Sequence, residues 1–122
     1  MAAYYFMTEE QWEKEKTYNL TDDQFLILNQ IEYKESKRKA ESLLRFLKKS
    51  IMLGNGSWTI SFTKFHKFYN DWVNKHKKKR PSLKNISLTQ LKFTVNRLRD
   101  LGLLIIEKNK KTNIYKRSEE HT

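Results

Sequence analysis

Helix-breaking residues are scarce in this chain of 122 residues. Its three glycines and one proline fall at Gly54, Gly56, Gly102 and Pro81. Because these two residue types most often interrupt regular structure, we expect long helices, with breaks near those four positions. A chain of this length usually forms one domain, since domains cluster at roughly 100–150 residues. The sequence therefore predicts one domain in which helices dominate.

Three four-residue segments carry the signature of a helix start: Thr8–Gln11, Thr21–Gln24 and Ser87–Gln90. In each, the first hydroxyl accepts the backbone N–H of the last residue, whose side chain reaches back to the first backbone N–H. An apolar residue lies directly before each segment and another directly after it, which is the arrangement of a hydrophobic staple. We expect helices to begin at these places and a further helix to begin after Ser61.

Apolar residues at helical spacing predict which helix faces are buried. They are Phe25, Leu28 and Ile31, then Ala40, Leu43, Leu44, Leu47 and Ile51, then Phe62, Phe65, Tyr69, Trp72 and Val73, and last Leu88, Leu91, Val95 and Leu98. The first two groups belong either to one long helix or to two helices joined near the polar run 34–39. The aromatic residues, with Trp58, are expected in the core.

Three segments are typical of strands: 57–60, 103–108 and 114–117. The polar residues 109–113 link the last two as a hairpin, and Gly102 lies where a left-handed residue ends a helix. The expected fold class is thus mainly α with a small antiparallel β-sheet (α+β). Residues 1–20 are expected to form a short helix or a dimer contact, and residues 118–122 a flexible tail.

Charge is distributed unevenly along the chain. The net charge is +11 and the isoelectric point is about 9.8, which favours a polyanionic partner. Residues 1–36 hold three basic and eight acidic side chains, whereas residues 37–122 hold 22 basic and six acidic ones. The acidic first third is therefore not expected to face the same polyanion as the rest.

Several function classes are excluded by composition. Without cysteine, the chain has no disulfide, no thiol nucleophile and no cysteine-based metal site. The three histidines, His66, His76 and His121, lack metal-ligand spacing, and no glycine-rich phosphate loop occurs. No enzyme, metal or cofactor is therefore expected. No apolar run approaches the roughly 20 residues that span a bilayer, and the first residues lack a secretory signal, so we expect a cytoplasmic protein without a membrane partner.

The order of these elements, with residues 98–104 (LRDLGLL) running from a helix through a glycine into an apolar strand, resembles the winged helix-turn-helix superfamily of bacterial DNA-binding proteins. The resemblance covers residues 21–117. It implies a supporting helix after Ser61, a recognition helix after Ser87 in the major groove of double-stranded DNA, and a wing at 109–113 on flanking backbone or minor groove. It also implies a homodimer that acts as a transcription regulator, plasmid partition adaptor or DNA replication factor. The basic connection 76–86 is longer than the tight turn of a simple helix-turn-helix.

Candidate DNA-binding residues fall into three groups. The outward arc of the helix after Ser87 carries side chains that suit base edges, because Arg pairs with guanine, Gln and Asn with adenine, and Thr or Phe contacts the thymine methyl. These are Thr89, Gln90, Phe93, Asn96 and Arg97. The cations suited to phosphates are Lys78, Lys79, Arg80 and Lys84 in the loop, and Lys108, Lys110, Lys111 and Lys116 in the hairpin. A further basic cluster is expected on the exposed face of an earlier helix: Lys37, Arg38, Lys39, Arg45, Lys48 and Lys49.

Two alternatives remain open at this point. Phe93 is a large apolar side chain on a solvent face, which suits a winged-helix module that binds a protein partner. The other alternative is a binder of single-stranded nucleic acid or RNA, which would require exposed aromatic side chains for base stacking.

Overall fold

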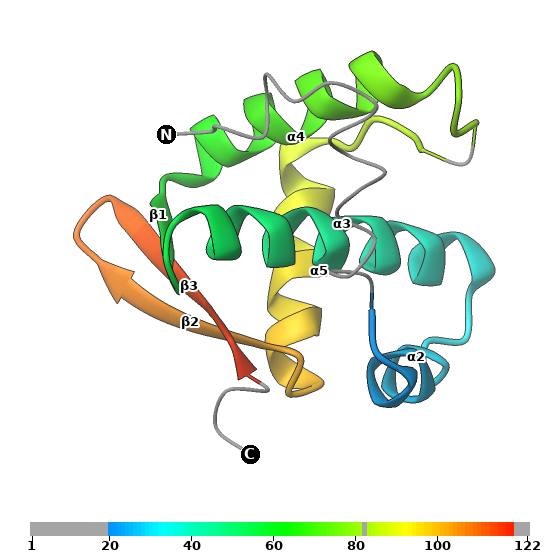
Figure 1. Ribbon diagram of the computed structural model, residues 1–122, viewed down its shortest axis with the longest axis horizontal. Helices are drawn as coiled ribbons and strands as arrows, with labels where there is room; N and C mark the ends of the chain where they lie inside the picture. The colour runs from blue at the N-terminus through cyan, green and yellow to red at the C-terminus, as the bar shows by residue number, and fades with distance from the viewer. Residues whose placement is uncertain (1–19, 82, 119–122) are drawn as a thin grey trace.

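Helices and strands follow one another in the expected order in the computed structural model, which describes residues 20–81 and 83–118 (Figure 1). The elements are α2 (Asp22–Leu28), α3 (Lys34–Leu53), β1 (Trp58–Ile60), α4 (Phe62–His76), α5 (Leu88–Asp100), β2 (Leu104–Asn109) and β3 (Thr112–Arg117). The expected α+β class is confirmed. The predicted helix start at Thr8–Gln11, nearly all of segment 1–20 and most of the tail lie outside the described residues.

The helix starts are formed by the side chains that the sequence indicates. Gln24 donates its backbone N–H to Thr21 Oγ1 at 3.2 Å, and Gln24 Oε1 accepts the backbone N–H of Thr21 at 2.9 Å. Ser87 and Gln90 make the same reciprocal pair at 3.1 and 3.3 Å. The hydroxyl of Ser61 caps α4. Each side chain satisfies a backbone N–H that a helix end leaves without a partner.

Apart from Ile31, the first two apolar groups belong to two separate helices. α2 ends at Leu28, and α3 begins at Lys34 after a connection in which Ile31 is buried. The break therefore precedes the polar run 34–39, which forms the first turns of α3. At 20 residues, α3 is about 30 Å long and crosses in front of α5 in Figure 1.

Glycines end α3 and α5 for different reasons. A Cβ at Gly54 would overlap the carbonyl oxygen of Ser57, so no larger residue fits where the chain leaves α3. Gly102 has φ +80° and follows the last turn of α5. The N–H of Leu103 bonds to the carbonyl of Leu98 at 2.9 Å, which completes a Schellman motif. The predicted left-handed residue at Gly102 is thus confirmed.

The sheet is antiparallel, with the strand order β1-β3-β2. Tyr115 at the centre of β3 lies opposite Trp58 on one side and Ile106 on the other, so these three side chains share the face that packs on the helices. The next pairs in register, including Thr59 with Ile114, form the opposite face.

The hairpin turn is shorter than expected. Asn109 pairs with Thr112, so only Lys110 and Lys111 form the turn, and the five-residue link predicted at 109–113 was wrong. Asn113 belongs to β3 and is buried. Its side-chain amide donates to the Tyr115 hydroxyl at 3.2 Å. The hydrogen bond allows a polar residue to occupy a buried strand position.

Phe46 lies at the centre of the aromatic core. Its ring centroid is 5.2–5.8 Å from those of Tyr69, Trp72, Trp58 and Phe65, in mostly edge-to-face contacts. All five side chains are buried. The core assignment of Trp58, Phe65, Tyr69 and Trp72 is confirmed, whereas Phe62 is only half-buried. Phe46 itself is an addition to the predicted core.

The basic cluster expected on the exposed face of α3 divides in two. Lys48 and Lys49 are buried, which contradicts the prediction for these residues. Lys48 Nζ donates to Gln24 Oε1 at 3.0 Å and so connects α3 to the cap of α2. The guanidinium carbon of Arg45 lies 5.9 Å from the Phe25 ring centroid. Among the other cations of the cluster, Arg38 is exposed, whereas Lys37, Lys39 and Arg45 are half-buried.

No helix in the part of the chain that the structure describes is long and apolar enough to cross a membrane.

Candidate nucleic-acid interface

α5 presents one buried and one accessible face. Leu91, Val95 and Leu98 are completely buried, and α5 packs against α3, α4 and β2. Of the outward residues expected to contact bases, Thr89, Gln90 and Phe93 are exposed, whereas Asn96 and Arg97 are half-buried. The inward stripe thus fixes the rotation of α5 about its axis, and this rotation directs the five candidate side chains away from the core.

Phe93 and Arg97 form a pair on the outward face. Phe93 retains 64% of its accessible surface, which is unusual for so large an apolar side chain. The guanidinium carbon of Arg97, one turn further on, lies 5.5 Å from the centroid of its ring. A cation over an aromatic face at this distance is attracted by the ring quadrupole. The pair therefore holds a planar cation and a planar ring together at the surface of α5.

The start of α5 is held by a polar clamp from α4, made by His66 and Asn70 on the backbone of Ile86. Asn70 Nδ2 donates to the Ile86 carbonyl and Asn70 Oδ1 accepts the Ile86 N–H, both at 2.9 Å. His66 Nε2 lies 2.7 Å from the same carbonyl and 3.0 Å from Asn70 Nδ2. The clamp fixes the position at which α5 leaves the preceding loop, directly before Ser87.

The His66–Asn70 clamp had no counterpart among the predicted functional residues. The available signal was a pair of polar side chains one turn apart on the amphipathic helix α4. Their partner is a backbone group 16 and 20 residues away, which no side-chain pattern indicates.

The basic loop between α4 and α5 carries accessible cations. Of the residues assigned to phosphate contacts in this loop, Lys78, Lys79 and Lys84 are exposed and Arg80 is half-buried. α4 ends at His76, and the next residues form a turn in which the Arg80 N–H bonds to the His76 carbonyl at 3.0 Å. Leu83 and Ile86 are buried, so apolar side chains fasten the loop at its second half.

The cations of the hairpin are not equivalent. Lys108, Lys110 and Lys111 are exposed, and the last two form the tip. Lys116 is half-buried, and its ammonium nitrogen lies 3.0 Å from Glu107 Oε2. Figure 1 places the hairpin and the basic loop near opposite ends of the long axis, with α5 between them. The predicted cations thus flank α5 on two sides.

A groove of about 290 Å³ runs between α3 and α5. It brings together four of the five candidates on α5 and leaves out Asn96. Its lining consists of Ser36 and Lys39 from α3, and Thr89, Gln90, Phe93, Thr94 and Arg97 from α5. Base-reading candidates therefore share a concave surface with a lysine from another helix.

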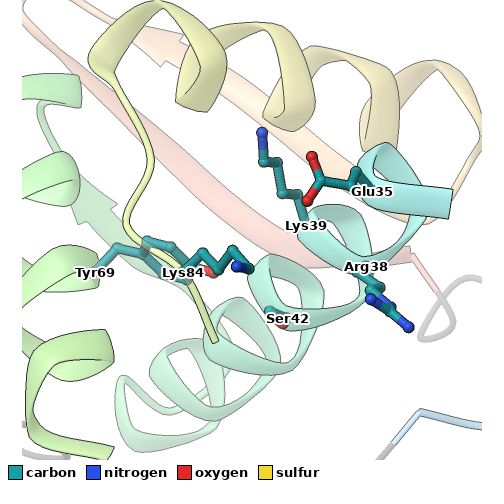
Figure 2. A pocket seen from close by; sticks show the side chains of 6 residues that line it. All are labelled: Glu35, Arg38, Lys39, Ser42, Tyr69 and Lys84. Atoms are coloured by element: carbon teal, nitrogen blue, oxygen red, sulfur yellow. The ribbon is translucent and has the colours of Figure 1, made fainter. Parts of the chain in front are cut away.

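A smaller cavity of about 20 Å³ lies between α3, α4 and the basic loop (Figure 2). It is lined by Glu35, Arg38, Lys39, Ser42, Tyr69 and Lys84. Burial raises the pKa of the Tyr69 hydroxyl above its ordinary value, and the hydrogen bond with Ser42 opposes this shift. At neutral pH the phenol is therefore protonated and contributes no charge.

Within residues 20–81 and 83–118, no three His, Asp or Glu side chains lie close enough together to hold a metal ion. His66 contacts the Ile86 carbonyl, and the His76 ring lies 5.7 Å from the Trp72 ring, measured between centroids.

Compared with known proteins, the chain matches no family model, no curated protein and no solved structure.

Proposed function

We propose that this protein binds double-stranded DNA in a sequence-specific manner as a winged-helix protein. In this proposal α4 is the supporting helix, α5 is the recognition helix in the major groove, and the β2–β3 hairpin is the wing on flanking backbone or minor groove. The element order α3-β1-α4-α5-β2-β3 supports the assignment, because it ends in a helix followed by a basic hairpin.

The observation that carries the proposal is the arrangement of two kinds of side chain around α5. Its outward face bears side chains that read base edges, and accessible cations lie on either side of it, in the loop and at the hairpin tip. Phosphate contacts supply affinity and fix the register of a protein on the duplex, whereas base contacts supply specificity. The chain has both kinds of group, arranged around one helix.

In this proposal the protein acts as a homodimer that regulates transcription, adapts a plasmid for partition or serves DNA replication. A dimer would read two half-sites separated by about one helical turn of DNA, or a multiple of it. Selection of bound duplexes from a random pool, together with the mass of the protein in solution, tests both the specificity and the dimer.

Arg97 provides the sharpest test of base reading. We expect Arg97→Ala to weaken binding to the selected sequence by about 1–3 kcal/mol and to relax the sequence preference. Arg99→Ala is the matched control, since Arg99 is exposed on the same helix and pairs with Asp100 at 3.2 Å. We expect Arg99→Ala to weaken binding to all sequences equally, and by less than Arg97→Ala weakens binding to the selected sequence. Equal effects of the two substitutions, or no duplex binding by the wild type at low salt, would count against the proposal.

A second candidate function is favoured by Phe93. An exposed aromatic ring beside a groove suits the docking of a protein partner. Phe93→Ala would then abolish a stoichiometric protein complex while the wild type shows no shift of any nucleic acid at low salt.

Binding of single strands by base stacking has less support. Trp58 and Trp72 are buried at 5% and 2% exposure, so bases have no access to their rings. Strong quenching of their fluorescence by an oligonucleotide would favour that alternative over the duplex.

A further inference from the structure

Lys39 occupies a junction between three elements that surround the start of α5. It lines the groove between α3 and α5, and it also lines the small cavity between α3 and the basic loop. Figure 2 shows its side chain extending from α3 toward α5, with Lys84 on the segment that leads into that helix. One lysine of α3 is therefore adjacent both to base-reading candidates and to a candidate phosphate contact.

The charges around this junction are mostly positive. Among the residues that line the two cavities, Arg38, Lys39, Lys84 and Arg97 are cationic and Glu35 alone is acidic. Within the described residues, no carboxylate oxygen lies within ion-pair distance of Lys39. Several cations with few acidic partners create a positive potential that concentrates polyanions. The surface beside α5 thus favours phosphate groups.

The dimensions of the DNA major groove give this surface an occupant. The groove is about 12 Å wide and a helix with its side chains measures about 10–12 Å, so the helix fills it. An element packed on the flank of such a helix then lies above one sugar–phosphate wall of the groove. α3 packs on the flank of α5 that carries Gln90, Thr94 and Arg97.

We infer that Lys39 contacts the phosphodiester backbone of DNA together with Lys84, beside the base-reading candidate Arg97 of α5. This inference rests on the proposed function and adds α3 to the DNA-binding surface. The contact releases counterions and does not depend on base sequence.

The test is the salt dependence of binding to a labelled duplex of about 20 base pairs, which is two helical turns. The slope of log K against log salt is negative, and Lys39→Gln should reduce its magnitude by about 0.9, on selected and arbitrary sequences alike. Lys39→Arg should keep the wild-type slope. Lys37→Gln is the matched control: it removes the same charge from the same helix, but Lys37 lines neither cavity and lies about 160° from Lys39 around the helix axis.

The outcomes separate the inference from the proposed function. A slope unchanged by Lys39→Gln in a wild type that binds duplex would overturn the inference and leave the proposed function intact. If Lys37→Gln reduced the magnitude of the slope as much as Lys39→Gln does, the inference would also be overturned, because net charge alone would explain the effect. If the wild type binds no duplex at low salt, both proposals are wrong. Circular dichroism of each variant checks that it remains folded.

Discussion

Tyr115 shows how the fold sets the chemistry of a single side chain. Its ring is completely buried against Trp58 and Phe65. Burial raises the pKa of its hydroxyl from 10 to about 12, although the hydrogen bond from Asn113 lowers it. In the unfolded chain the same hydroxyl ionises near pH 10. Tyr115 therefore contributes stability that is complete below pH 10 and is lost as the pH rises toward about 12.

Tyr115→Phe separates the hydrogen bond from the ionisation. At neutral pH we expect a loss of about 1–2 kcal/mol in the free energy of unfolding, because the buried Asn113 amide loses its acceptor. Between about pH 10 and 12 the wild type loses up to about 1.4 kcal/mol per pH unit through this group. The variant does not, so the difference between the two proteins should narrow.

Urea unfolding followed by tryptophan fluorescence, at about pH 7, 9 and 11, measures both effects. Tyr33→Phe is the control at neutral pH, because Tyr33 is 72% exposed and its substitution should leave stability unchanged. A difference between Tyr115→Phe and the wild type that stays constant with pH would contradict the assigned ionisation.

At the residue scale, sequence patterns separate faces of a helix less well than they identify the helix. The spacing of Ala40, Leu43, Leu47 and Ile51 predicts one buried face of α3 correctly, but Phe46 is buried as well because α3 packs against several elements. The burial of Lys48 has a similar origin. Its ammonium group donates to Gln24 Oε1, 24 residues earlier, and the sequence alone does not indicate that the packed helices bring these two groups together.

At the scale of elements, local interactions account for the correct predictions. The caps at Thr21, Ser61 and Ser87 and the turn at Gly102 depend on contacts within about one helical turn, which are written in adjacent residues. The start of α5 also depends on the His66–Asn70 clamp, which acts across 16–20 residues. A local pattern predicts where α5 begins, but not what holds it there.

Asn70→Ala tests the clamp. Both backbone groups of Ile86 lose a hydrogen-bond partner in a half-buried site, so we expect a loss of about 2–3 kcal/mol in the free energy of unfolding. Hydrogen exchange at the Ile86 amide should accelerate as well, since its acceptor is gone. Asn74→Ala is the matched control on the same helix, because Asn74 is exposed. If both variants have equal stability and exchange, the clamp does not position α5.

The hairpin shows a second limit of local patterns. Asn109, Thr112 and Asn113 are polar and typical of turns, yet all three belong to strands. The Asn113 side chain donates a hydrogen bond to the Tyr115 hydroxyl, and the turn consists of only the two lysines at the tip. Polar composition therefore located the hairpin but overestimated the length of its turn, because it does not reveal that Asn109 and Thr112 pair across the two strands or that Asn113 has a side-chain partner within its own strand.

At the scale of the whole molecule, the net charge of +11 describes groups in very different states. Some cations are buried, as Lys48 and Lys49 are, and others are paired, as Lys116 is with Glu107. Exposed cations lie in the basic loop and at the hairpin tip, on two sides of α5, and others, such as Lys64 and Lys92, lie on the helices. If the protein binds DNA as proposed, the placement of each cation should determine its contribution, and the total charge should not.

A comparison of Lys110→Gln with Lys116→Gln tests this directly, because each substitution lowers the net charge by one. Lys110 is exposed at the hairpin tip, so its loss should reduce the magnitude of the slope of log K against log salt for duplex binding by about 0.9. Lys116 should contribute less to that slope, because Glu107 at 3.0 Å already neutralises its ammonium group and competes with any phosphate. Fluorescence anisotropy between about 50 and 200 mM salt measures both slopes. Equal slopes would mean that overall charge, and not a positioned wing, attracts the DNA.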